Sequence, residues 1–115
     1  MELNLNTVQR PTLNLTMMDD EQTVLRVKMP TQEMFKELQN NAGALDAAAD
    51  GDADSTDYLY EQLARLLSNN RDHIMVTATE LKKGKKSKYH MDLEDAILVY
   101  RAYFDFITTT IKAKN

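Results

Sequence analysis

The stretch DAAADGDADSTDYLYE, residues 46–61, raises the possibility of a calcium site. Counted from Asp50, it places carboxylates at the first, third and fifth positions of an EF-hand loop and Glu61 at the twelfth. Ser55 occupies the sixth position, where the loop needs glycine for its sharp turn. The chain also offers no apolar helix before this loop and no second loop. We therefore interpret the stretch as an acidic linker that ends in a helix cap, and predict no metal site.

The run KKGKKSK, residues 82–88, could contact phosphates, because clustered lysines bind them in a salt-dependent way. Tyr89 and His90 follow it directly and could stack on bases. The run contains no arginine and no interleaved aromatic residues, and the chain carries a net charge of −4. These features disfavour nucleic acid as the partner, and favour a solvated tip or a contact with an acidic partner surface. The possible basic contacts are Lys82, Lys83, Lys85, Lys86 and Lys88.

Catalytic chemistry has little support in the remaining residues. The chain has no cysteine, and His73 and His90 have no serine or carboxylate at a recognisable motif spacing. Three glycines in the whole chain do not form a phosphate-binding loop. The seven methionines are typical of flexible core filler, with an adaptable binding surface as the alternative. We predict no catalytic residues, no cofactor and no enzymatic activity.

The length and composition of the chain indicate a single domain, residues 1–115, of a protein that is expected in the cytoplasm. Hydrophobic residues at 43% and charged residues at 28% are ordinary for a soluble protein of this length. The N-terminal MELNLNTVQR lacks the charged and apolar regions of a signal peptide. No apolar stretch approaches the roughly 20 residues of a membrane span, so no membrane partner is predicted.

The order of expected strands and helices predicts an α+β fold, which would position the acidic and lysine-rich segments. Residues 1–29 are expected to form strands, because apolar side chains alternate with polar ones on both sides of MDDEQ (Met18–Gln22). That pattern predicts an antiparallel hairpin over Thr12–Met29, and Leu3–Val8 could add a third strand to make a small sheet. About three helices should follow, at 31–42 behind a Thr31 cap, at 56–69 and at 93–112. Loops are expected at 43–55, which is acidic, and at 82–90, which is rich in lysine.

The long C-terminal helix is aromatic-rich and apolar around roughly half its circumference, a wider stripe than an ordinary surface helix shows. One interpretation is a central helix, packed by the hairpin on one side and by the 56–69 helix on the other. Another is that part of this surface meets a second chain, which makes a homo-oligomer or a partner-binding groove expected. The residues predicted to bind a partner are Tyr100, Tyr103, Phe104, Phe106 and Ile107.

The order of segments resembles a known family. A short polar β start, then MPTQEMFKELQ, an acidic middle and a closing DLEDAILVYRAYFDFI are similar to the tail assembly chaperones of long-tailed (siphovirus-type) phages and related prophages. The resemblance spans most of the chain and rests on pattern rather than on a diagnostic signature. The lysine-rich run at 82–88 departs from the pattern of that family.

The resemblance implies a binding function. Such chaperones coat the tape measure protein and help tail tube protein polymerise around it, in the cytoplasm of the bacterial host, and are absent from the mature virion. An apolar groove that covers a helical client fits this role. Two alternatives stay open. The first is a small phage or bacterial nucleic-acid-associated regulatory protein that acts through the lysine loop, and the second is a structural tail or connector subunit.

Overall fold

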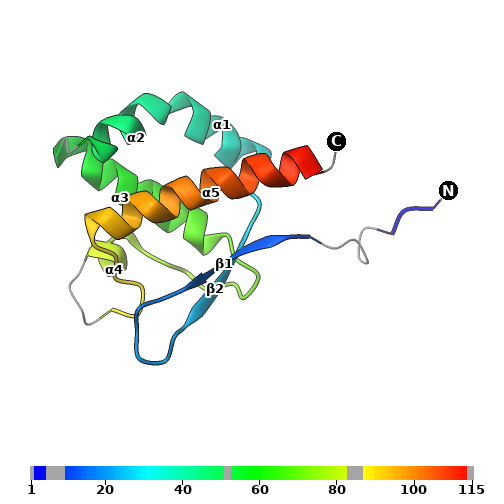
Figure 1. Cartoon of the computed structure of the whole chain (residues 1–115), viewed down its shortest axis with the longest axis horizontal. Helices are drawn as coiled ribbons and strands as arrows, with labels where there is room; N and C mark the ends of the chain where they lie inside the picture. Colours follow the sequence, from blue (N-terminus) through cyan, green and yellow to red (C-terminus); the bar gives the residue numbers. More distant parts are fainter. Residues whose placement is uncertain (1, 5–9, 51–52, 83–86, 114–115) are drawn as a thin grey trace.

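The computed structural model describes residues 2–4, 10–50, 53–82 and 87–113 (Figure 1). Over these residues the fold is mixed α+β, with one two-stranded antiparallel sheet and five helices. The strands come first and the helices follow, as the sequence predicts, but there are two more helices than expected. The elements are β1 (Thr12–Thr16), β2 (Val24–Lys28), α1 (Gln32–Asn40), α2 (Ala42–Ala49), α3 (Ala53–Ser68), α4 (Ala78–Lys82) and α5 (Leu93–Ala113).

The hairpin forms within the predicted segment Thr12–Met29. Leu15 pairs with Leu25 and Asn14 with Arg26, so the apolar residues of both strands share one face. Leu25 is fully buried, whereas Arg26 beside it is exposed. Asp19 closes the predicted turn, because its carboxylate accepts hydrogen bonds from the backbone and hydroxyl of Thr23. Leu5–Val8 of the proposed third strand lie outside the described residues, and residues 2–4 have no strand conformation.

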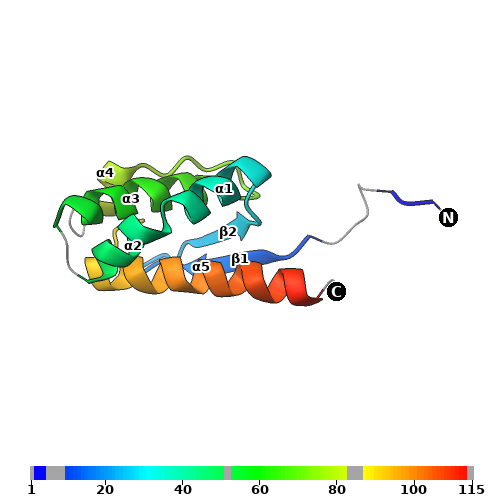
Figure 2. The same cartoon turned by 90° about the horizontal axis from the view of Figure 1, so that it is seen from above.

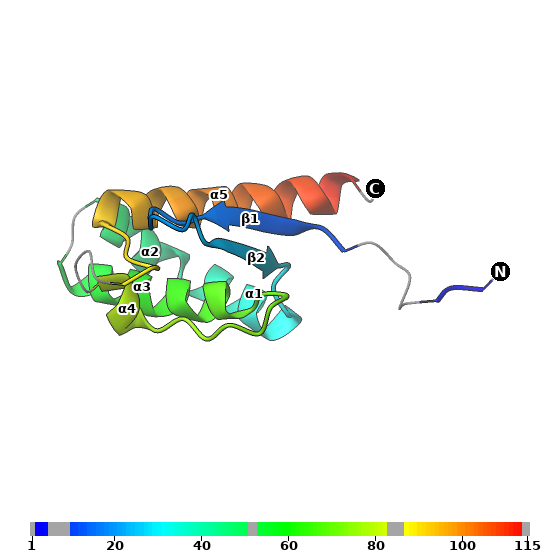
Figure 3. The same ribbon diagram turned by 90° about the horizontal axis from the view of Figure 1, so that it is seen from below.

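The outer edge of β2 pairs with the segment that leaves α3. The backbone N–H of Lys28 donates to the Asn69 carbonyl at 2.9 Å, and Arg71 N–H donates to the Arg26 carbonyl at 3.0 Å. A single bridge between Val27 and Asn70 lies between these two bonds. Viewed from below, α5, β1, β2 and this segment follow one another across the molecule (Figure 3). The pairing fixes the hairpin to the C-terminal end of α3.

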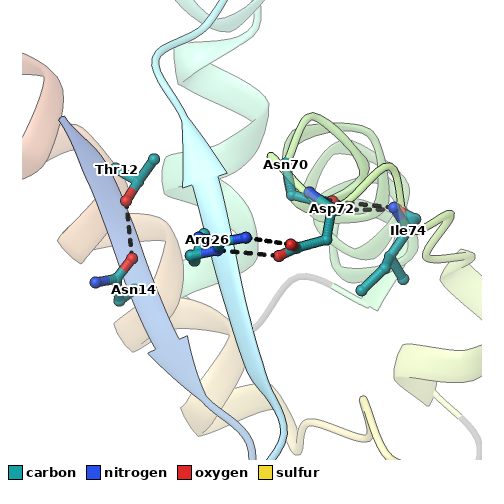
Figure 4. Close-up of polar contacts among 6 residues, drawn as sticks. All are labelled: Thr12, Asn14, Arg26, Asn70, Asp72 and Ile74. Carbon is teal, nitrogen blue, oxygen red and sulfur yellow. Dashed lines mark hydrogen bonds and ion pairs between the residues drawn. The ribbon is translucent and has the colours of Figure 1, made fainter. Parts of the chain in front are cut away.

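Asn70 organises the turn that makes this pairing possible. Its Oδ1 accepts hydrogen bonds from the backbone N–H groups of Asp72 and Ile74 at 3.1 and 3.0 Å. Its Nδ2 donates to the carbonyls of Leu67 and Ile74 at 2.7 and 2.8 Å. Figure 4 shows how the turn also directs Asp72 toward Arg26, with which it forms a two-bond ion pair. The hydrogen-bonding groups of this buried amide are therefore satisfied within the chain.

The acidic segment 43–55 is not the loop that the sequence predicts. Ala42–Ala49 form helix α2, and α3 begins at Ala53, three residues before the expected start. The segment lacks an amphipathic period, which made it resemble a loop. Alanine nevertheless has the highest helix propensity of all residues, and this local preference decides the conformation here. The helix at 31–42 is correspondingly shorter, ending at Asn40, while its predicted Thr31 cap accepts from Met34 N–H at 3.2 Å.

Helix α3 presents the predicted leucine stripe to the core, since Leu59, Leu63, Leu66 and Leu67 are all buried. The short helix α4 begins with a capping box, in which the Thr77 hydroxyl accepts from Glu80 N–H and the Glu80 carboxylate accepts from Thr77 N–H. These bonds are each 3.2 Å long. Lys82, the first residue of the lysine-rich loop predicted at 82–90, is instead the last residue of α4. Residues 83–86 of that predicted loop lie outside the described residues.

Helix α5 is the longest element; it lies alongside β1 (Figure 2) and crosses α3 (Figure 1). It spans one residue more than the predicted 93–112. Ala96, Tyr103, Ile107 and Thr110 recur at helical spacing and are buried, so one narrow face of α5 meets the core. Among the helices of the described residues, none combines the length and the apolar character needed to cross a membrane. The core that these elements enclose consists of Met17, Leu25, Val27, Leu38, Ala48, Leu59, Leu63, Ala64, Leu66, Leu67, Val76, Leu81, Tyr89, Met91, Ala96, Tyr103 and Ile107.

Candidate partner-binding site

The residues predicted to bind a partner do not form one surface patch. Tyr103 and Ile107 are 1% and 2% exposed, so they belong to the core and are not accessible to a partner. The Tyr103 hydroxyl faces the end of β2, where it lies 3.5 Å from the carbonyl oxygen of Lys28. Burial raises the pKa of Tyr103 well above its usual range. The sequence showed that this helix is widely apolar, but not which part of that surface the neighbouring elements cover.

Tyr100 and Phe104 lie together on one flank of α5. Their rings meet edge to face with centroids 4.9 Å apart, and both side chains are half-buried. Burial, with smaller contributions from Asp46 and Tyr58, raises the pKa of Tyr100 to about 12. Because Asp46 belongs to α2, this flank faces the helix that was expected to be a loop. The pair therefore packs largely against the protein itself.

Phe106 lies on the opposite flank of α5, and its ring is tilted against Tyr103 with centroids 6.3 Å apart. At helical spacing it shares this flank with Asp95 and Val99, which face β1. The aromatic side chains of α5 thus form two separate ring pairs in the described structure, and the expected aromatic surface is not present as a single cluster. Of the five predicted residues, Tyr100, Phe104 and Phe106 retain partial exposure.

An apolar hollow of about 180 Å³ lies between the end of β1 and the first turns of α5. Two of its apolar side chains are largely open to solvent, with Met18 67% and Leu98 59% exposed. Large apolar side chains gathered at such a depression are typical of contact surfaces. We name this depression the methionine hollow; its lining comprises Leu15, Thr16, Met17, Met18, His90, Met91, Asp95, Leu98 and Val99.

Sequence reasoning missed Leu98, although a signal for it exists. Glu94, Arg101 and Asp105 mark the solvent face of α5, and Leu98 lies among them at helical spacing. A leucine in the middle of a charged helix face is directed toward solvent and not toward the core. It therefore indicates an exposed apolar contact point. Of the methionines around it, Met17 and Met91 belong to the core, as the core-filler interpretation expects, whereas Met18 is exposed.

A second and more polar hollow, of about 620 Å³, adjoins the first one and shares Met18 and His90 with it. Four carboxylates line it, from the hairpin turn and from the residue that precedes α5, and Lys88 provides a positive charge. The Lys88 ammonium lies 3.9 Å from Glu21, and His90 Nε2 lies 3.1 Å from Asp92. We name this depression the acidic hollow; its lining comprises Met18, Asp19, Asp20, Glu21, Ser87, Lys88, His90 and Asp92.

The walls of both hollows are held by hydrogen bonds to Met91. The Tyr60 hydroxyl of α3 donates to the Met91 carbonyl at 2.9 Å, and Met91 N–H donates to the Leu81 carbonyl of α4 at 3.0 Å. His90 next to it has a buried Nδ1 atom without a hydrogen-bond partner among the described residues. The segment before α5, which lines both hollows through His90, is thereby fixed against α3 and α4.

The lysines predicted as basic contacts are engaged within the chain where the structure describes them. Lys82 lies 2.9 Å from Asp57 and Lys88 lies 3.9 Å from Glu21. These pairs are exposed, so each adds little to stability. Lys83, Lys85 and Lys86 lie outside the described residues. The two described lysines thus face carboxylates of their own chain.

The EF-hand interpretation is not supported by the backbone of this region. Helix α3 begins at Ala53, so most of the stretch from Asp50 to Glu61 is helical instead of wrapping around an ion. Over the described ranges, no group of three or more histidine, cysteine, aspartate or glutamate side chains is arranged to hold a metal. His73 is exposed in a turn with a φ of 57°. Within the part of the chain that the structure describes, the two hollows are depressions that could receive another molecule.

No family model, no curated protein and no solved structure matches this chain. Its candidate function accordingly depends on the arrangement of its own residues. The site combines thioether and hydrocarbon walls with a carboxylate rim. Such a site can hold an apolar group beside a cation.

Proposed function

We propose that this chain is a non-catalytic tail assembly chaperone of the long-tailed phage type, which binds the tape measure protein and promotes assembly of the tail tube. The proposal rests on the resemblance of MPTQEMFKELQ and DLEDAILVYRAYFDFI to that family and on the methionine hollow. The hollow carries more of the argument, because it offers exposed apolar surface at a fixed place. A client that exposes apolar helical segments needs such a surface to stay dispersed.

The contact surface in this proposal differs from the one that the sequence suggested. Met18 and Leu98 form its accessible part, and the partly exposed Phe106 extends the same flank of α5. Methionine side chains are flexible and polarizable, so they adapt to apolar side chains of different shapes. That property suits a protein that must bind many segments of one long client. Tyr103 and Ile107 support this surface from below and make no contact with the client.

Further parts of the proposal follow from the same role. Several copies bind along one client and contact one another, which makes the working form a homo-oligomer. The protein acts in the cytoplasm of the bacterial host and leaves before the virion is complete. The acidic balance of the chain and the paired lysines Lys82 and Lys88 favour a protein client over nucleic acid.

Co-purification of the full chain with the tape measure protein, at low and at high salt, tests the proposal. We expect retention at both salt concentrations, because apolar contacts are insensitive to screening. Leu98→Asp should abolish retention, since it places a charge in the methionine hollow. Thr108→Asp is the matched control, because it adds the same charge to an exposed position of α5 outside the hollow and should leave retention unchanged.

Two outcomes would overturn the proposal. One is absence of the tape measure protein from the purified material at both salt concentrations. The other is salt-sensitive binding to DNA or RNA that is lost on replacing Lys85 and Lys86, which would make the lysine segment the functional site. Circular dichroism of Leu98→Asp must show the helix content of the unchanged chain for its result to count.

A further inference from the structure

We propose, building on the function above, that the two adjoining hollows select a basic amphipathic helix. An apolar side chain of the client enters the methionine hollow, and lysine or arginine side chains one turn away lie over the acidic hollow. The partner is thereby defined by its chemistry, an apolar helix face bordered by positive charge. Three properties of the described residues support this assignment.

The size of the methionine hollow suits one side chain. An apolar cavity of about 150 Å³ holds a benzene-sized group. The hollow of about 180 Å³ therefore accommodates a leucine or a phenylalanine side chain. Sites for drug-sized ligands start at roughly 300 Å³ and are mostly apolar, so the methionine hollow alone is too small for such a ligand. The acidic hollow, of about 620 Å³, is large enough, but four carboxylates line it instead of a mostly apolar wall. A side chain projecting from a larger partner fits better.

The charge around the hollows is complementary to a cationic partner. Five carboxylates line the two depressions, whereas the basic side chains of the described lining are one lysine and one histidine. Among the described residues, this excess of negative charge favours lysine and arginine side chains over phosphate groups. The carboxylates are Asp19, Asp20, Glu21, Asp92 and Asp95.

The two hollows adjoin each other, as neighbouring side chains on one face of a helix do. They share Met18 and His90, so they meet along a common wall. On a helix, residues three and four positions apart are neighbours, with about 5–6 Å between their Cβ atoms. An apolar residue and a basic residue at this spacing can therefore occupy the two adjoining depressions together. A strand would direct alternate side chains to opposite faces, which suits this arrangement less well.

The test uses two synthetic helical peptides with identical leucine positions, one with lysine and one with glutamate at every polar position. Binding of each labelled peptide to the full chain is measured by fluorescence anisotropy at low salt. We expect the lysine peptide to bind at least about tenfold more tightly, a difference of about 1.4 kcal/mol. The triple variant Asp20→Asn, Glu21→Gln, Asp95→Asn should remove most of that difference.

The matched control is Glu33→Gln, Glu61→Gln, Asp105→Asn, which changes the net charge equally at exposed positions away from the hollows. It should preserve the preference. Equal binding of both peptides, or equal loss of preference in both triple variants, overturns the inference on charge. If the tape measure protein is retained through Leu98 in spite of such a result, the proposed function stands without this inference. If Leu98→Asp changes neither peptide binding nor client retention, both proposals fail.

Discussion

Asn70 holds Ile74 through both of its backbone polar groups: its Nδ2 donates to the Ile74 carbonyl at 2.8 Å, and its Oδ1 accepts from Ile74 N–H at 3.0 Å. This reciprocal contact closes the turn after α3 around a side chain that is 2% exposed. The same turn supplies the backbone groups that pair with β2. One buried amide thus connects the helical part of the core to the hairpin.

We expect Asn70→Asp to lower the free energy of unfolding by about 2–4 kcal/mol, because two buried carbonyl groups lose their donor and a carboxylate replaces the amide. Urea unfolding followed by circular dichroism measures the change. Asn40→Asp makes the same chemical change at an exposed position and should cost less than about 1 kcal/mol. Equal effects of the two substitutions would contradict the role assigned to Asn70.

Leu98 and Leu63 should respond differently to truncation. Leu63→Ala creates a cavity in the core and is expected to cost about 2–5 kcal/mol. Leu98→Ala should change stability by less than about 0.5 kcal/mol, since the side chain is 59% exposed. Thermal unfolding of the two variants makes the comparison. A large loss for Leu98→Ala would mean that this leucine supports the fold and is not reserved for a partner.

Gly43→Ala tests whether α2 is a helix. A Cβ at Gly43 would meet no atom within 4 Å, and the residue lies inside α2, so alanine fits without strain. Because glycine is a poor helix former, the substitution should stabilise the protein by about 0.5–1 kcal/mol. The reciprocal change Ala47→Gly should destabilise it by a similar amount. If the segment were a loop in solution, neither substitution would follow helix propensity.

Stability should decline in alkaline solution, because tyrosines that are buried in the folded protein ionise more readily in the unfolded state. The pKa of Tyr100 is raised from about 10 to about 12 in the folded state, so below about pH 10 the hydroxyl is protonated in both states and its contribution is fully present. Between about pH 10 and pH 12 only the unfolded state loses the proton, and stability falls. Tyr100→Phe should reduce this dependence, as urea unfolding across the range would show. If the slope of unfolding free energy against pH is the same in Tyr100→Phe as in the unchanged chain, Tyr100 titrates like an exposed tyrosine.

Lys88 should compete with a basic client for the acidic hollow. Its ammonium lies 3.9 Å from Glu21, so Lys88→Gln frees that carboxylate and is expected to tighten binding of the lysine peptide about two- to fivefold. Lys36→Gln on α1 removes the same charge from an exposed position outside both hollows. Anisotropy titrations of the two variants check the expectation. Similar gains in both would attribute the effect to net charge alone.

The sequence predicted those elements whose side-chain period is strong. Alternation at Leu13, Leu15, Leu25 and Val27 marked the hairpin, and the leucine stripe marked α3, because each pattern determines which face is buried. The periodicity of the sequence did not predict α2, because its alanines do not alternate with polar residues in a helical period. Helix propensity was the only indication of a helix in this segment. Elements without a clear period are therefore the ones where local propensity must be weighed first.

The candidate site was harder to predict than the fold. Tyr103 and Phe106 looked equivalent on a widely apolar helix, yet only one of them faces the core. Which side of α5 is covered depends on where β1 and α2 lie, and no local pattern contains that information. The carboxylates of the acidic hollow are separated by about seventy residues in sequence and meet only when the hairpin turn folds beside the start of α5.

The pairing between β2 and the Asn69–Arg71 segment has a consequence for aggregation. A free strand edge is a template onto which other chains can add, and a two-stranded sheet normally offers two such edges. Here the edge of β2 is occupied by backbone from the same chain, and helix α5 lies alongside β1 on the other side of the sheet (Figure 3). On β1, the Thr12 hydroxyl donates to the Asn14 side-chain oxygen at 2.8 Å, on the face of the hairpin that also carries Arg26 (Figure 4). Strand addition between copies of this chain is thereby restricted on both sides of the sheet.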